Sequence, residues 1–356
     1  MNACAAQEAV GQYADEPHEP ASAEATATPF LQDPPNPTYS PGPETFQSSI
    51  LRPGIEPVAY IADSCAYLEM RWDPQNSKPG TVVAPIMFHG IVKGNGQPTQ
   101  AQDINFETFE QIIALAEDLG FETITTDELV GFLTENAKIP PRSMILILDD
   151  RRPGTAEDYF LPVNERNDWT TTLAWIAQAD TEQRKGRLPG ESLWDWIERI
   201  YATGYFDVQS HGLNHRLYLV EGLPEEVVRE EIAGSILVLE EHFGQRPIAY
   251  IWPGGDYTFL GIQVAREAGF KLGFTVQSRG PILFNWIPQG EKELAHNDPL
   301  MLLPRFWSSA ALRNLEQTTQ IGDDAAEFAK QNYAAEANWY STYCGGRLPP
   351  LEDVLK

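Results

Sequence analysis

The sequence predicts an α/β protein whose parallel sheet is closed into a barrel. Three observations lead to this expectation. Apolar runs alternate with amphipathic segments from about residue 80 to residue 306, polar side chains follow the ends of the apolar runs, and neither GxGxxG nor GxxxxGK[ST] is present. Such alternation is typical of a parallel sheet covered by helices, either open and doubly wound or closed. The length of the alternating segment favours the closed form.

The first half of the alternation contains three expected strands and two expected helices. Strands are expected in residues 81–90 (TVVAPIMFHG), 143–150 (SMILILDD) and 169–176 (WTTTLAWI). A helix is expected in residues 105–120, where apolar residues have helical spacing between an Asn cap and a terminal Gly. A second helix is expected in residues 125–136, which begin with Thr and Glu at capping-box spacing.

The second half continues the same alternation of strands and helices. Helices are expected in residues 191–205, 224–244 and 259–269, and strands in residues 206–212, 247–253, 270–276 and 300–306. Residues 151–168 and 177–190 are irregular and are interpreted as loops that could cap or reshape a groove.

Composition excludes several classes of partner. The chain has 356 residues and a formal net charge of −26, which argues against binding to nucleic-acid phosphates or to an anionic lipid surface. No run of 18 apolar residues is present, so no integral membrane span is expected. The three cysteines, Cys4, Cys65 and Cys344, lack CxxC spacing, so at most one disulfide can form.

The chain divides into four predicted parts. Residues 1–45 are interpreted as a disordered linker, because the first 44 residues hold eight of the 28 prolines and no Lys or Arg precedes Arg52. Two interpretations of this linker stay open: an ordinary disordered terminus, or a lipoprotein remnant anchored through Cys4. Residues 46–80 are expected to form an N-terminal extension, residues 81–310 the main α/β domain, and residues 311–356 a C-terminal helix and tail.

Two short stretches carry the chemistry. The stretch SHGLNH places His211 and His215 four residues apart, so a helical turn would put both imidazoles on one face, where they could hold a divalent cation. Asp150 is the expected third ligand, and Asp149 stays free to take a proton from water. The alternatives are chance spacing of the histidines and a solvated acidic turn whose counter-charges are Arg151 and Arg152.

The order and sequences of these motifs resemble those of the polysaccharide deacetylases with NodB homology, carbohydrate esterase family 4. SMILILDD, DVQSHGLNH and AYIWPGGDY are similar to the successive motifs of that family, and the resemblance spans Val83 to Phe306. The stretches PIMFHGI and PPRSMILILDD resemble the entry of the branch that contains poly-N-acetylglucosamine deacetylases. The resemblance implies a distorted (β/α) barrel of the NodB-homology type.

The resemblance also implies roles for individual residues. It makes Asp149 the general base, and it makes Asp150, His211 and His215 the ligands of a divalent metal, usually zinc, with cobalt, nickel or iron as alternatives. The backbone N–H of Gly254 would stabilise an oxyanion, and His89 would be the general acid, although a histidine at a strand end is more often a packed core residue. The expected substrate-binding residues are Trp252, Pro253, Asp256 and Arg305.

Two departures from the family pattern affect these roles. Arg151 stands where the family has a glycine after the aspartate pair, which puts access to the site in doubt. The arginine that orients the catalytic aspartate in many members is absent, because Ile251 and Trp252 precede the proline. Arg151 or Arg305 could replace it.

The implied function is that of an exported, metal-dependent hydrolase. Its partner would be an N-acetylated glycan such as poly-N-acetylglucosamine, a chitin-like oligomer or peptidoglycan, from which it would remove N-acetyl groups at the cell surface or outside the cell. Two alternatives remain: a carbohydrate-binding protein that keeps the metal ligands without turnover, and a deacetylase of a small amide.

Overall fold

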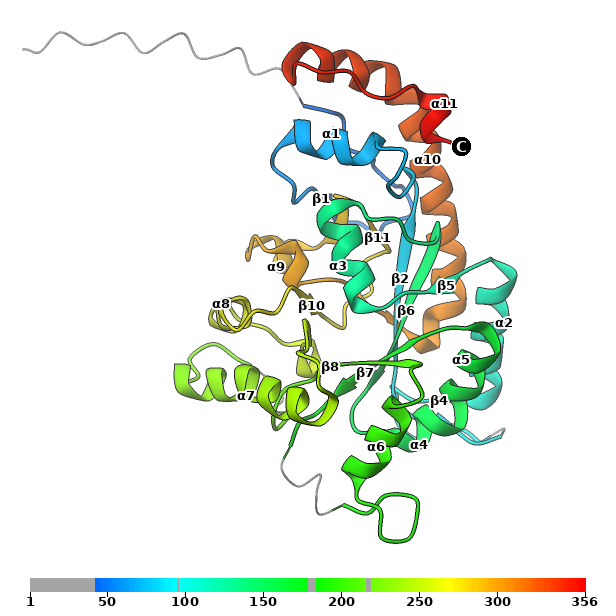
Figure 1. The fold of residues 1–356 in the computed structure, drawn as a ribbon, viewed down its shortest axis with the longest axis vertical. Coiled ribbons are helices and arrows are strands. Elements are labelled where there is room, and N and C mark those ends of the chain that lie inside the picture. Colours follow the sequence, from blue (N-terminus) through cyan, green and yellow to red (C-terminus); the bar gives the residue numbers. More distant parts are fainter. Residues whose placement is uncertain (1–41, 95, 179–183, 216–218) are drawn as a thin grey trace, which may run out of the picture. The chain divides into compact units, whose positions relative to one another are not determined.

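The core of the protein is a curled, mostly parallel sheet (Figure 1). The computed structural model describes residues 42–356 except residues 95, 179–183 and 216–218. The order of the strands is β10-β9-β8-β7-β6-β2-β11, with β13 also paired to β2 and β5 also paired to β6. The strands are β2 (Val82–Phe88), β5 (Glu122–Thr123), β6 (Arg142–Asp149), β7 (Thr171–Trp175), β8 (Phe206–Ser210), β9 (Ala249–Ile251), β10 (Leu272–Phe274), β11 (Ile282–Leu283) and β13 (Phe306–Trp307).

One short segment connects the two ends of this sheet. Leu303 forms a parallel bridge to Phe274 of β10, and β13, which begins three residues later, pairs in parallel with β2. β11, which pairs with the start of β2, is antiparallel. The sheet is therefore a distorted, incompletely closed barrel, as predicted, and the carboxyl ends of its parallel strands face one mouth.

Most helices lie around the outside of the sheet, and others pack against neighbouring helices (Figure 1). They are α1 (Ser64–Trp72), α2 (Phe106–Asp118), α3 (Thr126–Glu135), α4 (Pro153–Thr155), α5 (Leu161–Asn167), α6 (Leu193–Tyr201), α7 (Glu225–Phe243), α8 (Phe259–Glu267), α9 (Glu291–Leu294), α10 (Ala311–Tyr343) and α11 (Leu351–Val354). Single helical turns span Ala156–Phe160, Pro253–Gly255, Pro299–Met301 and Ser308–Ala310. Two further strand pairs are β1 (Glu56–Val58) with β12 (Ile287–Gln289) and β3 (Ile91–Val92) with β4 (Ile104–Asn105).

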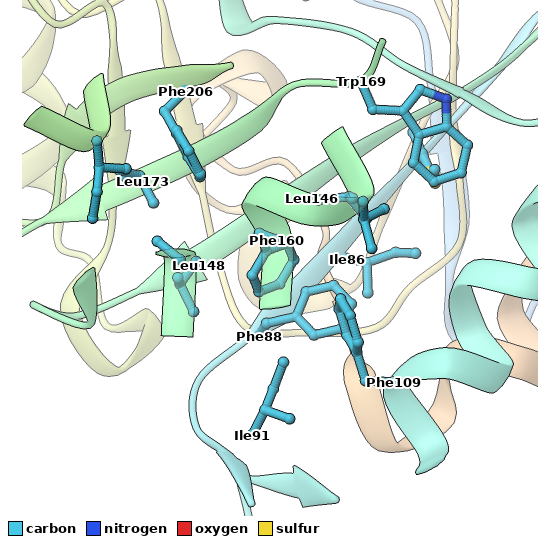
Figure 2. Packing of buried hydrophobic residues seen from close by; sticks show 14 of the residues in the cluster. Ile86, Phe88, Ile91, Phe109, Leu146, Leu148, Phe160, Trp169, Leu173 and Phe206 are labelled. Atoms are coloured by element: carbon cyan, nitrogen blue, oxygen red, sulfur yellow. The ribbon is translucent and has the colours of Figure 1, made fainter. Parts of the chain in front are cut away.

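The apolar runs form strands because both faces of the sheet are covered. All seven residues of β2 are buried, and so are seven of the eight residues of β6. Side chains that alternate along these strands pack into different clusters, and one cluster contains Phe88, Leu146 and Phe160 (Figure 2). Burial on both faces explains why these strands are continuous apolar runs without alternating polar residues.

Local signals placed several helices correctly. Asn105 accepts a hydrogen bond from the backbone N–H of Thr108 at the start of α2, and Thr125 and Glu128 form the capping box of α3. Pro224 directly precedes α7, and Gly244 ends it in a left-handed conformation.

Two predictions about secondary structure were wrong. Residues 153–167, interpreted as loop, form α4, a π-helical turn and α5, because Ala156, Phe160 and Val163 bury their side chains against the core. Of residues 300–306, predicted as one strand, only Phe306 belongs to a strand. Residues 299–301 instead form a 3-10 turn that Asp298 caps.

Residues 42–356 form one compact unit, and the predicted boundaries at residues 80 and 310 lie within it. A disulfide between Cys65 in α1 and Cys344 at the end of α10 ties the N-terminal extension to the C-terminal helix. The linker predicted in residues 1–45 and the anchor predicted at Cys4 lie almost wholly outside the described residues, which begin at residue 42. Among the described helices, none has the length and apolar character needed to cross a membrane.

Candidate functional site

The end of β6 places two aspartates at the mouth of the barrel, and they have different environments. Asp149 is 2% exposed, and Arg305 Nη1 donates to its Oδ1 at 2.6 Å. Burial is the largest single influence and would raise the pKa of Asp149, but the charge of Arg305, its hydrogen bond and the nearby His211 and His89 together outweigh burial and hold this pKa below its usual value. Asp149 is therefore an ionised, fixed carboxylate.

Arg305 is held as firmly as the carboxylate that it contacts. Its side chain has no exposed surface, and its Nε donates to the carbonyl of Thr275 at 2.7 Å. The sequence left open whether Arg151 or Arg305 orients Asp149, and the structure selects Arg305. A side chain without exposed surface does not offer a contact to substrate, so the prediction that Arg305 binds substrate is not supported.

Asp150 turns in another direction because its backbone is left-handed, with φ of 71°. Its Oδ2 accepts hydrogen bonds from Nε and Nη2 of Arg152 at 3.3 and 3.1 Å. Its Oδ1 faces the Nε2 atoms of His211 and His215 at 3.9 and 3.7 Å. Arg152 therefore occupies one carboxylate oxygen and leaves the other toward the histidines.

The two histidines follow β8, where the chain bends instead of forming the helical turn considered from the sequence. Gly212 has φ of 81° and His215 has φ of 51°. The Nδ1 atom of His211 donates to the carbonyl of Ile251 at 2.8 Å, because a carbonyl can only accept. This bond fixes the tautomer and leaves the Nε2 lone pair free toward Asp150.

Asp150, His211 and His215 together fit a divalent metal. One potential ligand atom from each residue lies within 4.8 Å of the other two. Burial is the main cause that lowers the pKa of both histidines, so both stay neutral and keep a lone pair at neutral pH. Two imidazoles and one carboxylate leave open coordination positions on zinc or a similar ion.

Glu231 of α7, which the sequence analysis missed, supports the loop that carries these histidines. Its side chain is 1% exposed and accepts the backbone N–H of Asn214, while its backbone carbonyl accepts the N–H of Leu213. A Cβ at Gly212 would lie 2.5 Å from Glu231 Oε1, so only glycine allows this approach. The sequence did contain a signal for this role: Glu231 stands at a position of the predicted amphipathic helix where an apolar, buried residue is expected.

His89 lies directly after β2, on the other side of Asp149. Its Nε2 is 3.8 Å from Asp149 Oδ2, and its ring stacks on Trp307 with centroids 6.3 Å apart. Burial lowers the pKa of His89 more than the two aspartates raise it. Asp103, also missed from the sequence, accepts the backbone N–H of Gly90 at 2.7 Å and so holds the loop after His89.

The turn after β9 brings only some of its predicted residues to the surface. Gly254 is exposed and left-handed, with φ of 64°, and Asp256 is half-buried. Pro253 is buried, and Trp252 is fully buried, with its Nε1 donating to the carbonyl of Met301. Trp252 therefore has no surface for a sugar and is not retained as a substrate-binding residue.

Comparisons with known proteins bear on the family and the fold. Residues 136–273 match the family model described as polysaccharide deacetylase. The Bacillus subtilis (strain 168) protein named "Putative polysaccharide deacetylase YxkH" is 22% identical over 192 residues, which are 54% of this chain and 63% of that protein. This chain thus spans less than two thirds of the length of that relative.

Solved structures share the fold at low sequence identity. The Streptococcus pyogenes deacetylase PplD in complex with acetate has a TM-score of 0.54 and 21% identity, covering 68% of this chain and 99% of that chain. IcaB from Ammonifex degensii has a TM-score of 0.52 and 19% identity, covering 68% and 98%. A de-N-acetylase from Aggregatibacter actinomycetemcomitans has a TM-score of 0.52 and 12% identity, covering 66% and 99%.

The family match contains the residues on which the site depends. Residues 136–273 include Asp149, Asp150, His211, His215 and Gly254, whereas His89 and Arg305 come from outside this range. Residues 136–273 are thus identified as part of a polysaccharide deacetylase domain by the family match, and the solved structures show that the chain shares their fold.

Proposed function

We propose that this protein is a metal-dependent hydrolase that removes N-acetyl groups from N-acetylhexosamine units of an extracellular glycan. The proposal rests on one observation: the two adjacent aspartates have different contacts and can therefore have different roles. Asp150, His211 and His215 place their ligand atoms within 4.8 Å of one another, whereas Asp149 accepts a hydrogen bond from Arg305, which keeps it an ionised base. Poly-N-acetylglucosamine, chitin-like oligomers and peptidoglycan are the proposed substrates.

The proposed metal is zinc, held by Asp150, His211 and His215. When bound there, a divalent cation supplies Lewis acidity toward the acetyl carbonyl and toward water. The His211 tautomer fixed by Ile251 and the neutral state of both histidines support this assignment.

The residues around the metal ligands each have one proposed task. Asp149 takes a proton from the attacking water, and the N–H of Gly254 donates to the developing oxyanion. His89 supplies a proton to the leaving amine. Its lowered pKa makes the protonated imidazole a stronger acid, and its position beside Asp149 keeps both proton-carrying groups at the same reacting amide.

The Cys65–Cys344 disulfide supports export, because disulfides persist mainly in oxidising compartments. Localisation at the cell surface or outside the cell is therefore proposed together with the activity. Anchoring through Cys4 remains a prediction from the sequence.

The test is acetate release from N-acetylglucosamine oligomers by the zinc-loaded protein. We expect chelation to abolish release, and we expect Asp149→Asn to lower kcat/KM by about 10²- to 10⁴-fold while zinc content stays at the wild-type level. Metal analysis of both proteins separates loss of the base from loss of the metal.

No acetate release from oligomers or peptidoglycan fragments, with zinc demonstrably bound, would contradict the proposal for these glycans. A binding protein or an enzyme for a small amide would then be the better interpretation.

A further inference from the structure

A cavity lies beside α10, β13 and the segment that leads into β11, and none of the residues assigned above to metal binding or catalysis lines it. β11 pairs with Val82 and Val83, whereas β13 pairs with Ile86 and Met87. Residues before β11, a residue of β13, the first half of α10 and residues 50–52 line this cavity, whose volume is about 230 Å³.

The cavity wall has the opposite charge from the protein as a whole. Arg52, Arg279 and Arg313 line it, and no Asp or Glu is among its lining residues in the described part of the chain. The formal net charge of the chain is −26. The charge of Arg279 is balanced by Glu293, but Arg52 and Arg313 have no carboxylate beside them in this wall, a local exception that favours an anionic ligand.

Two of the three arginines have side-chain N–H groups that make no hydrogen bond to a described residue. Arg279 is fully engaged: it pairs with Glu293 at 3.1 Å and donates to Thr275 Oγ1 and two carbonyl groups. Arg52 donates from Nη2 to the carbonyl of Ser278 and keeps its other N–H groups, and Arg313 is exposed and makes no hydrogen bond or ion pair with any described residue.

Neutral polar groups at the wall also lack partners. Thr318 has no exposed surface and Asn314 is 6% exposed, and both line the cavity. Thr318 Oγ1 and Asn314 Nδ2 have no hydrogen-bond partner within the described ranges. Buried polar atoms are ordinarily paired, so a ligand oxygen that reached either atom would gain a hydrogen bond.

We propose that this cavity binds a small oxyanion, a carboxylate or a phosphate group. The guanidinium groups of Arg52 and Arg313 hold its oxygens, and Asn314 and Thr318 contribute hydrogen bonds from the wall formed by α10. Nothing in this assignment depends on the deacetylase activity proposed above.

The location of the oxyanion site relative to the metal-binding residues follows from the geometry of β13. Successive side chains of a strand point to opposite faces. Phe306 lines the cavity, whereas its neighbours Arg305 and Trp307 contact Asp149 and His89. One short strand therefore separates the oxyanion site from the catalytic residues.

The test is the melting temperature of the full-length protein as a function of phosphate or acetate concentration, with sodium chloride added to keep ionic strength constant. We expect a saturating rise with at least one of the two anions, because a ligand of the native state stabilises it by mass action. The anion that gives the rise distinguishes a phosphate ligand from a carboxylate ligand.

Variants separate this cavity from other anion sites. Arg313→Gln should raise the apparent dissociation constant by about tenfold or more, and Thr318→Val, which removes one hydroxyl group and keeps the shape, should also weaken binding. Arg347→Gln is the matched control, because Arg347 is likewise exposed without a hydrogen bond or ion pair to a described residue.

Binding at the metal centre would survive Arg313→Gln, so equal dissociation constants for that variant and the wild type would overturn the proposal. The absence of saturation with both anions would overturn it as well.

Discussion

At the scale of single residues, Asp149 shows burial and charge acting in opposite directions on one carboxyl group. Burial favours the protonated form, whereas Arg305, His211 and His89 favour the carboxylate. The second effect is larger, so the pKa of Asp149 is lowered. The hydrogen bond from Arg305 at 2.6 Å also fixes the direction of the carboxylate. Arg305 is thus a positioning residue that acts on the reaction through Asp149.

Replacing Arg305 with glutamine should raise the pKa of Asp149, because the positive charge of Arg305 would no longer oppose the effect of burial. We expect the acidic limb of the pH profile of kcat/KM to move to higher pH, with zinc content unchanged. Arg305→Lys keeps the positive charge and should leave that limb close to its wild-type position. An unchanged limb in Arg305→Gln would contradict this role.

The same substitution should destabilise the fold in a pH-dependent way. Removing one partner of a buried ion pair costs about 3–5 kcal/mol. Because the native pKa of Asp149 is lowered, the pair stabilises the protein above the ordinary aspartate pKa of about 3.9, and this contribution is lost as pH falls through the lowered pKa. Urea unfolding should therefore show a larger difference between wild type and Arg305→Gln at pH 7 than at pH 2.

The metal-ligand candidates could be predicted from the sequence because each belongs to a short motif at a strand end. The partner of Asp149 could not, because Arg305 lies 156 residues away and reaches it through the fold. Likewise, Trp252 stands in a recognisable motif, but its burial depends on the distant carbonyl of Met301.

At the scale of elements, α7 supports the histidine loop through Glu231. Glu231→Gln would place an amide N–H₂ or a weaker acceptor opposite the backbone N–H of Asn214. We expect metal affinity to fall about 10- to 100-fold, which is the usual effect of losing a residue that orients ligands. Competition with a chromogenic chelator measures this affinity.

A neighbouring residue provides the control for this substitution. Glu230 is exposed on the same helix and forms no hydrogen bond or ion pair with a described residue, so Glu230→Gln changes the net charge equally without touching the loop. Equal metal affinities in the two variants would rule out the support assigned to Glu231.

Elements with local signals were predicted well, and elements that depend on packing were not. The caps at Asn105 and Thr125 and the stop at Gly244 act within a few residues, so the sequence alone reveals them. The residues 153–167 were interpreted as loop because their sequence is irregular; they begin with Pro and contain Gly154 and Pro162. Their helix depends on burial of Phe160 against Phe88 and Phe109.

At the scale of the whole molecule, the Cys65–Cys344 disulfide joins residues 279 positions apart. Around it, Leu68 and Trp72 of α1 pack with Ala329 of α10 in one buried cluster. A cross-link over so long a loop restricts the unfolded chain strongly, and removing such a bond typically costs about 2–4 kcal/mol.

We expect Cys344→Ser to lower the melting temperature while the rate of acetate release at 25 °C stays close to that of the wild type. The reason is that the active-site residues come from the strand ends, whereas this cross-link joins α1 to the end of α10. Reduction of the wild type should reproduce the shift, and identical melting curves of oxidised and reduced protein would contradict the prediction.

The same cross-link determines what a protease can release from this protein. A single backbone cut anywhere between residues 65 and 344 leaves both fragments covalently joined. Such a nicked molecule would migrate as one species on a non-reducing gel and as two after reduction. Between these cysteines, one cut converts the protein into a two-chain molecule without freeing either part.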